Sequence, residues 1–282
     1  MTPGGARIAP ARWPESIAKP CHLLVDQIET TQMLRDHTTL VRRLQDALDR
    51  SSSMATKAWW EGYLKAVIPF RGVGIPQIRA VLADWRAEQD VASWPPLDQL
   101  SLALRLFDEP LAEDKIAGTL YLQEYLCGEL PWRVAVPQYS SLFERGLIAD
   151  WNTCDWFCVR VLGPTIALNG RLCAATISRW RSSPILWKAR ASVVSLVPVI
   201  DNPGYHQLAL RSAAVLIRRQ ERFAKTAVGW ILRDLSKYDE ELARVFLDEN
   251  LVHFSTESLR NALKYAPLAT RQEYLRHLRA AR

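Results

Sequence analysis

Apolar side chains recur every three to four positions along most of this chain. Between residues 24 and 50 they are Leu24, Ile28, Met33, Leu34, Leu40, Leu44 and Leu48. This spacing places them on one face of a helix, and the same period predicts helices near 58–67, 76–89, 97–108 and 113–126. No alternating strand pattern is found. The β-prone run 193–200 continues a helical pattern, so we interpret it as a buried helix end. The pattern predicts an all-α protein.

Breaks at glycine, proline and serine separate these segments at intervals of about one helix. Pro76 stands where the first position of a helix belongs. Many short helices joined by short loops bury their apolar faces by stacking as antiparallel pairs, which favours an α-solenoid; a compact helical bundle is the alternative. We expect an N-terminal extension over 1–50, a mobile tail rich in proline and glycine followed by one helix, and a repeat domain over 51–282.

Charge is distributed unevenly along the 282 residues, although the net value is only +6. The part from Trp151 to the end holds 20 Lys and Arg against 11 Asp and Glu, a balance of +9, and the part before it carries −3. This asymmetry suggests that the second half meets a polyanion. Ordinary solvated helix faces explain the same charges equally well.

Cysteine and histidine spacing gives no sign of a metal site. The five cysteines form no CxxC pair and the five histidines lie far apart, so we expect neither a metal nor a cofactor. An odd cysteine count without a framework favours a reducing compartment, and no apolar run is long enough for a signal core or a bilayer span. We therefore expect a cytoplasmic protein without a membrane partner.

Four side chains on successive helical segments stand out. Trp151 and Asp155 are four residues apart, which puts an indole and a carboxylate one turn apart on one helix face. Arg190 and Trp230 each lie on a later helical segment. In a solenoid, residues from different repeats converge on one concave groove. An acid, a guanidinium and two indoles are suited to holding a cationic nucleoside on a DNA backbone.

At these residues the chain resembles the AlkD-like DNA alkylation-repair glycosylases, which are built from HEAT-like repeats as a right-handed type of solenoid with a concave DNA-binding groove. The likeness runs from about Tyr63 to Leu278 and includes Pro69-Phe70-Arg71-Gly72-Val73, similar to the family's first turn. Arg71, Gly74 and Ile75 depart from the residues of the family member compared. The segment Lys225 to Arg233 is similar to the one that carries the family's second indole.

The resemblance implies that Asp155 is the catalytic carboxylate. An N3- or N7-alkylated purine is already a cation and a good leaving group, so a single carboxylate can stabilise the oxocarbenium charge on the sugar and orient water. A helix N-terminal acid favoured by the dipole is the plain structural alternative. Trp151 and Trp230 would present indole faces to the cation, and Tyr63 would line the groove.

Arg190 is expected to bind a DNA phosphate near the lesion, with a salt bridge between repeats as the alternative. Sequence-independent phosphate contacts are expected from Arg79, Arg218, Arg219, Lys225 and Arg233. We assign six other tryptophans to packing: Trp59, Trp60, Trp85, Trp156, Trp180 and Trp187.

The function implied is that of a monofunctional DNA glycosylase of base excision repair, a monomer acting on double-stranded DNA. Its expected substrates are cationic N3- and N7-alkylpurines, from methyl groups to bulky adducts, hydrolysed without base flipping and without lyase activity. Three alternatives stay open: a family relative that binds DNA without excision, a helical-repeat scaffold for another protein, and a self-resistance glycosylase for one natural-product adduct.

Overall fold

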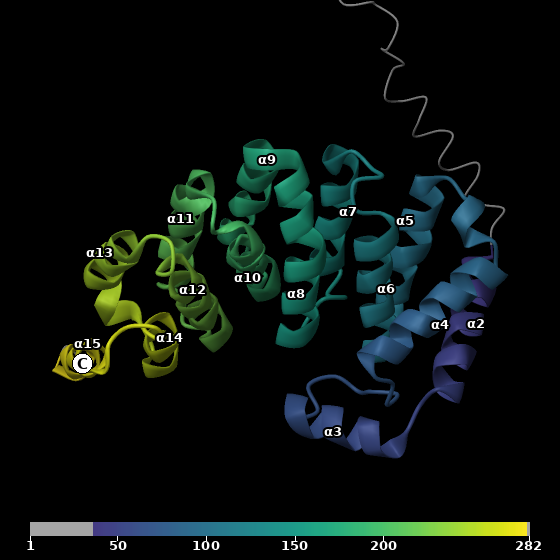
Figure 1. Cartoon of the computed structure of the whole chain (residues 1–282), viewed down its shortest axis with the longest axis horizontal. Coiled ribbons are helices and arrows are strands. Elements are labelled where there is room, and N and C mark those ends of the chain that lie inside the picture. Colours follow the sequence, from purple (N-terminus) through teal and green to yellow (C-terminus); the bar gives the residue numbers. More distant parts are fainter. Residues whose placement is uncertain (1–35, 281–282) are drawn as a thin grey trace, which may run out of the picture. The chain divides into compact units, whose positions relative to one another are not determined.

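The computed structural model describes residues 36–280, and within these limits the elements are helical and no strand is found (Figure 1). The α-helices, in chain order, are α2 (His37–Arg50), α3 (Met54–Leu64), α4 (Ile75–Glu88), α5 (Pro96–Arg105), α6 (Ala112–Tyr125), α7 (Trp132–Glu144), α8 (Trp151–Phe157), α9 (Gly163–Ser178), α10 (Leu186–Val194), α11 (His206–Leu216), α12 (Arg222–Leu235), α13 (Glu240–Asn250), α14 (Thr256–Ala262) and α15 (Leu268–Ala280).

The helix boundaries follow the breaks in the sequence closely. Pro76 is the second residue of α4, one position later in the helix than the sequence predicts. The helix α3 begins before the expected residue 58, because the hydroxyl of Ser53 accepts the backbone N–H of Thr56 at 3.1 Å and caps the helix there. The β-prone run forms no strand: Val193 and Val194 end α10, and after a short turn Val197–Val199 form the 3-10 segment η5. The prediction of a buried helix end is thus confirmed.

The helices from α4 onward form two adjoining rows. The even-numbered helices α4, α6, α8, α10, α12 and α14 pack in series, each on the next (Figure 1). The odd-numbered helices α7, α9 and α11 pack in a second series, and the turns between consecutive helices lead the chain from one row to the other. This arrangement is an α-solenoid of helical repeats, the fold class that the sequence predicts.

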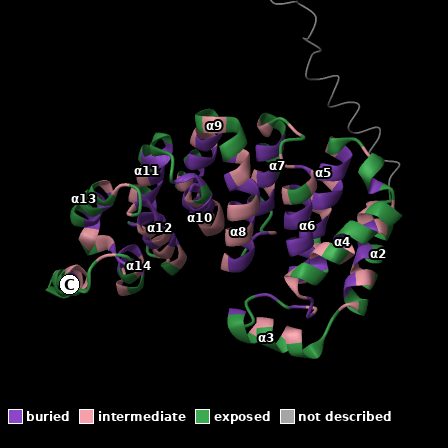
Figure 2. Ribbon diagram, in the orientation of Figure 1, coloured by how far each residue is buried: buried purple, intermediate pink, exposed green. Residues whose placement is uncertain are grey.

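The helix α6 is the most enclosed element, as the burial colours in Figure 2 show. Every residue from Ala112 to Leu122 is buried, including three charged side chains. Each of the three has partners: Glu113 accepts backbone N–H groups, Asp114 pairs with Arg71, and the ammonium of Lys115 donates to the carbonyl of Phe107. Buried charges persist in a protein only with such partners.

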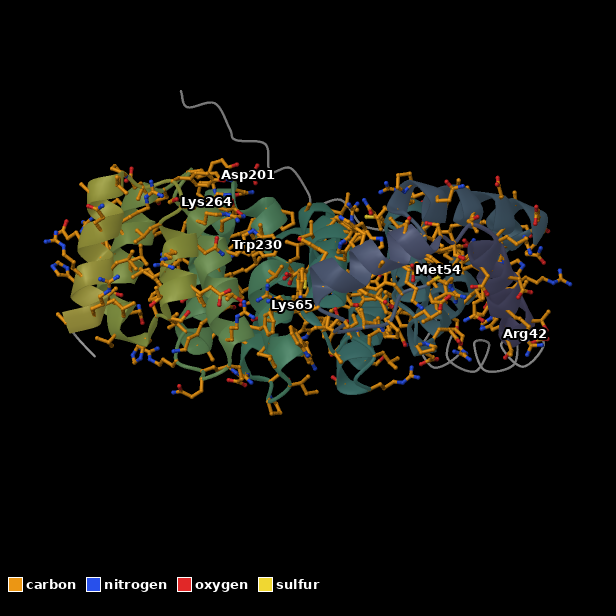
Figure 3. All side chains as sticks on the ribbon, turned by 90° about the horizontal axis from the view of Figure 1, so that it is seen from below. Arg42, Met54, Lys65, Asp201, Trp230 and Lys264 are labelled. Carbon is orange, nitrogen blue, oxygen red and sulfur yellow. The ribbon has the colours of Figure 1, made fainter. Side chains whose placement is uncertain are left out.

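The short helix α3 stands outside both rows in Figure 1. Figure 3 shows it between the labels of Met54 and Lys65, with the Lys65 end nearer to Trp230 of α12. A ring of α3 touches the even-numbered row, since Tyr63 meets Trp151 edge-on with centroids 6.4 Å apart. The helix α3 therefore supplies a second wall opposite the even-numbered helices.

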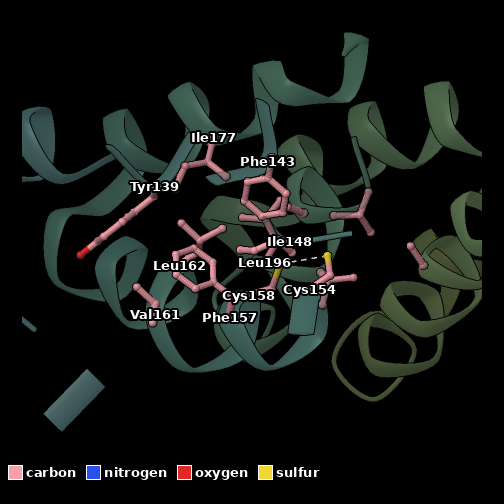
Figure 4. Close-up of a cluster of buried hydrophobic side chains, with 14 of the residues drawn as sticks. Tyr139, Phe143, Ile148, Cys154, Phe157, Cys158, Val161, Leu162, Ile177 and Leu196 are labelled. Carbon is pink, nitrogen blue, oxygen red and sulfur yellow. Dashed lines mark hydrogen bonds between the residues drawn. The ribbon is translucent and has the colours of Figure 1, made fainter. Parts of the chain in front are cut away.

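The inner side of α8 is anchored in an aromatic core (Figure 4). Phe157 is fully buried and meets Phe107, Tyr139 and Phe143 edge-on, at centroid separations of 5.7, 5.5 and 6.0 Å. Burial of one such side chain stabilises the fold by about 1.5–3 kcal/mol. Because this side of α8 is fixed in the core, the opposite side, with Trp151 and Asp155, is held in place.

The helix α2 packs on α4, and both belong to one compact unit, His37–Arg282. Residues 1–35 of the N-terminal extension expected over 1–50, which include the expected mobile tail, lie outside the described residues. None of the helices between residues 36 and 280 combines the length and apolar character needed to cross a bilayer.

Candidate active groove

A groove of about 610 Å³ lies between α3 and the helices α8, α12 and α14. Half of its lining residues are aromatic, and polar side chains lie among the rings. The aromatic lining consists of Trp59, Trp60, Tyr63, Trp151, Trp156 and Trp230. The polar lining consists of Asn152, Asp155, Arg160, Arg233 and Asn261. The structure thus brings together Tyr63, Trp151, Asp155, Trp230 and Arg233, which the sequence places on three separate helices.

The start of α8 sets the direction of its two groove residues. Asp150 caps the helix: one carboxylate oxygen accepts the backbone N–H of Thr153 at 2.9 Å and the other accepts its hydroxyl at 2.6 Å. Trp151 is then the first helical residue, and Asp155 follows one turn later. The capping role belongs to Asp150, and the dipole effect falls off beyond the first turn, so helix capping does not explain Asp155.

Asp155 is joined to Arg190 by two hydrogen bonds. Nε of Arg190 donates to Oδ1 at 2.7 Å and Nη2 donates to Oδ2 at 2.9 Å. The third nitrogen, Nη1, donates to the carbonyl of Phe223 at 2.6 Å and to the hydroxyl of Thr226 at 3.1 Å. The Arg190 side chain is 5% exposed, and it links α8, α10 and α12. This geometry is the salt bridge between repeats, the alternative to phosphate binding; direct contact of Arg190 with a phosphate stays a prediction.

The electrostatics of this pair follow from its burial. Burial raises the pKa of Asp155 above its ordinary value, and the attraction and hydrogen bonds of Arg190 oppose that rise. Burial is the largest single influence on Arg190 and acts against its charge, but the attraction and hydrogen bonds of Asp155, together with Cys154 and Cys158, outweigh it and raise the pKa of the guanidinium. Both carboxylate oxygens accept from the guanidinium fork, which is the geometry of an ionised pair. At 15% exposure, Asp155 keeps access to the groove.

A series of contacts between aromatic rings connects α3 with α8. Trp59 stacks on Tyr63 with centroids 5.4 Å apart and rings 7° from parallel, and Tyr63 meets Trp151. Trp230 faces them from α12, with the guanidinium of Arg233 5.7 Å from its ring. The indole nitrogen of Trp230 is buried without a hydrogen-bond partner among the described residues. These rings form surfaces suited to a cationic or aromatic ligand.

The assignment of Trp59 to packing is wrong, because this side chain is 59% exposed. Trp60 and Trp156 pack against the core as expected, and they also line the groove together with Trp59. Trp59 precedes Tyr63 by four residues, so one helix face carries both, and this spacing was the available signal. Trp85 and Trp180 are buried as expected. Trp187 packs against Phe223, with ring centroids 5.2 Å apart.

The turn 69–73 fixes α3 relative to the even-numbered row. The carboxylate of Glu113 accepts the backbone N–H groups of Arg71, Gly72 and Val73 at 2.8, 2.7 and 3.0 Å. Gly72 has φ +104°, and a Cβ there would lie 2.3 Å from the carbonyl oxygen of Ser53. Only glycine fits this conformation and this close approach. Phe70 belongs to the same turn and stacks on Trp60 of α3, with centroids 5.4 Å apart.

The expected phosphate-binding cations differ in where they point. Arg233 lines the groove and pairs with Asp234 at 2.7 Å. Arg79 pairs with Glu124 at 2.6 Å, and the ammonium of Lys225 donates to the carbonyl of His253 at 2.6 Å; neither lines the groove. Two further candidates also lie outside it: Arg218 donates to Ala214, and Arg219 pairs with Glu221. Arg160, which lines the groove, was missed by sequence reasoning.

The protein is an α-solenoid of helical repeats with an indole-lined groove that contains the carboxylate of Asp155. The model of the DNA alkylation repair enzyme family matches residues 44–266, so the chain belongs to this family. Membership supports a role in the repair of alkylated DNA, and it confirms the resemblance that the sequence motifs carry. No curated protein matches the chain.

The fold is similar to that of a solved structure described as a predicted DNA alkylation repair enzyme from Enterococcus faecalis. The likeness covers 77% of this chain and 98% of that chain, with a TM-score of 0.66 and 18% sequence identity. At this identity the comparison shows a shared fold, and it supports the solenoid described above.

Proposed function

We propose that this chain is a monofunctional DNA glycosylase that hydrolyses the N-glycosidic bond of cationic N3- and N7-alkylated purines. The observation that carries the proposal is Asp155, a carboxylate held in place by Arg190 at the edge of an indole-lined groove. Its substrate is double-stranded DNA, on which it acts as a monomer in the cytoplasm. Family membership supports DNA as the substrate and the repair of alkylated DNA as the role.

The reaction needs one fixed negative charge. As the bond from C1′ to the purine nitrogen breaks, its electron pair leaves with the purine, which becomes neutral, and positive charge moves to the sugar. The Asp155 carboxylate stabilises that charge and directs water to C1′. Water adds its oxygen to C1′ and gives a proton to Asp155 or to solvent. The products are a free base and an abasic site.

The aromatic residues select for charge. Trp151 and Trp230 offer π faces to the cationic nucleoside, and each such contact contributes roughly 0.5–2 kcal/mol. A neutral base gains no such term, so it is held less tightly. The exposed Trp59 extends the same wall outward and supports acceptance of bulky adducts as well as methyl groups. On this proposal the lesion is held at the open groove, without extrusion into a closed pocket.

The test is release of the base from DNA that carries N7-methylguanine, N3-methyladenine or a large minor-groove adduct. Wild type should release it, and Asp155→Asn should be slower by roughly 10²-fold or more. Asp248→Asn is the matched control, because Asp248 is an ion-paired carboxylate outside the groove, and it should behave as wild type.

Equal rates for Asp155→Asn and wild type, with both folded, would remove the carboxylate from the mechanism. No release from any of the three lesions would reject the glycosylase proposal. Salt-sensitive DNA binding would then point to a non-catalytic DNA-binding relative, and its absence to a protein-interaction scaffold.

A further inference from the structure

Arg160 stands on the groove wall beyond Asp155. Its guanidinium carbon lies 4.1 Å from the centroid of the Trp156 ring, so the cation is stacked on an indole. Both residues line the same groove as Asp155. One edge of the guanidinium is engaged, since Nη1 donates to the side-chain oxygen of Gln123 at 3.1 Å. The stacking partner and the hydrogen-bond acceptor are both uncharged.

The guanidinium of Arg160 differs from the other cations near the groove in its lack of a carboxylate partner among the described residues. Arg190, Arg233 and Arg79 each pair with a carboxylate. Arg160 has no ion pair with a carboxylate among residues 36–280. Burial lowers the pKa of Arg160, the neighbouring charge of Arg79 lowers it further, and Glu124 opposes this effect. Since Glu124 is already paired with Arg79, the protein leaves the charge of Arg160 largely uncompensated.

A local irregularity of the helix sets the position of Arg160. The segment η3 (Cys158–Leu162) is π-helical, and the N–H of Gly163 donates to the carbonyl of Cys158, five residues back. A π segment widens the helix and changes the register of the residues that follow, and such segments occur frequently at functional sites. In this register Arg160 faces the groove and stacks on Trp156.

We propose that Arg160 binds a phosphodiester of the DNA strand held in this groove, with Trp156 and Gln123 fixing the plane of its guanidinium. This inference rests on the proposed function. A guanidinium fork matches two phosphate oxygens, and stacking on an indole leaves its outer edge free to donate. Arg160 lies five positions after Asp155, so the two are at most about 7.5 Å apart along the helix axis. A deoxyribose at Asp155 therefore places a backbone phosphate within reach of Arg160.

The readout is the salt dependence of DNA binding by the full-length protein. Each phosphate neutralised by a cation contributes about 0.9 to the slope of log affinity against log salt concentration. Arg160→Gln and Arg160→Met should both lower the slope by about that amount and weaken binding to an alkylated duplex. Arg160→Lys should restore the slope, because the charge returns, while affinity stays below wild type because the fork and the stacking are lost.

The matched control is Arg133→Gln on α7. Arg133 also stacks on a tryptophan, Trp132, at 4.6 Å, but it lies outside the groove, so its removal should leave the slope unchanged. An unchanged slope in Arg160→Gln and Arg160→Met, with wild type binding and excising normally, would overturn this inference and leave the proposed function intact. Failure of wild type to bind DNA would overturn both.

Discussion

Arg190 holds both carboxylate oxygens of Asp155, at 2.7 and 2.9 Å, and at the same time donates to α12 through the carbonyl of Phe223. The carboxylate is therefore oriented by three helices of the even-numbered row and not only by its own. The negative charge of Asp155 therefore has a fixed position and orientation before any ligand binds. Such preorganisation is what electrostatic catalysis requires.

Arg190→Lys tests this positioning. Lysine keeps the positive charge but cannot donate in parallel to two oxygens and reach α12 as well. We expect single-turnover excision to fall by roughly 10²-fold, as a misplaced catalytic group does. Arg190→Ala should also destabilise the fold by about 3–5 kcal/mol, because Asp155 would stay behind as an unpaired, largely buried charge. Denaturant unfolding measures that loss.

Arg222→Lys serves as the control for that experiment. Arg222 donates to both oxygens of Glu257, each at 2.7 Å, in the same fork geometry but on an exposed surface. The excision rate and the free energy of unfolding of Arg222→Lys should match those of wild type. Equal behaviour of Arg190→Lys and Arg222→Lys would show that the fork on Asp155 has no catalytic role.

The pH dependence of excision should reflect the burial of Asp155. The proposed reaction would use the carboxylate form of Asp155, and its raised pKa means that the group takes up its proton at a higher pH than an exposed aspartate. The single-turnover rate should therefore fall on acidification, with a midpoint above the ordinary value of about 3.9. The rate of base loss from DNA without protein at each pH corrects for spontaneous loss. A midpoint at or below about 3.9 would contradict the prediction.

Gly72→Ala should loosen α3. At φ +104° and with a Cβ 2.3 Å from the carbonyl oxygen of Ser53, alanine demands a shift of the turn. Gly146→Ala is matched to it, because Gly146 has φ +71° but open space around the new Cβ. Gly146→Ala should cost about 1–2 kcal/mol of stability from the backbone conformation alone. Gly72→Ala should cost more and also weaken substrate binding, since α3 carries Trp59 and Tyr63.

Affinity for an alkylated duplex and thermal unfolding together check the turn variants. If Gly72→Ala and Gly146→Ala lost equal stability and both bound DNA normally, the close approach of the turn to Ser53 would have no role in placing α3.

Trp59→Ala and Trp85→Ala should separate binding from stability. Trp59 is 59% exposed, so its loss should change the unfolding free energy by less than about 0.5 kcal/mol. Binding of an alkylated duplex should weaken by about 1–3 kcal/mol if a base stacks there. Trp85 is 2% exposed and donates to the carbonyl of Leu40, so Trp85→Ala should cost about 3–5 kcal/mol of stability. Normal DNA binding by Trp59→Ala would exclude stacking on this indole.

Local pattern in the sequence was sufficient to predict the helices and one face of the site. The apolar period marks each helix, Pro76 marks a helix start, and the four-residue spacing puts Trp151 and Asp155 on the same face of α8. The convergence of Trp230 on the same groove required the stacked repeats, which short helices and short loops predict.

Contacts between distant segments were beyond the reach of sequence pattern. Nothing in the spacing shows that Arg190 donates to Asp155 and to Phe223, because that choice depends on how three helices pack. The exposure of Trp59 depends on the turn at Gly72, which holds α3 off the two rows. Arg160 was missed because its direction depends on the π segment, and a change of helical register leaves no mark in the apolar period.

The fork between Asp155 and Arg190 has a mechanical consequence. A solenoid flexes easily because each repeat contacts only its neighbours. The planar guanidinium of Arg190, however, connects Asp155 of α8 with the carbonyl of Phe223 in α12. A change of curvature between α8 and α12 would therefore break one of these hydrogen bonds or displace the carboxylate of Asp155. The chain is thus stiffer in this section, and a change of its curvature would move the carboxylate of Asp155.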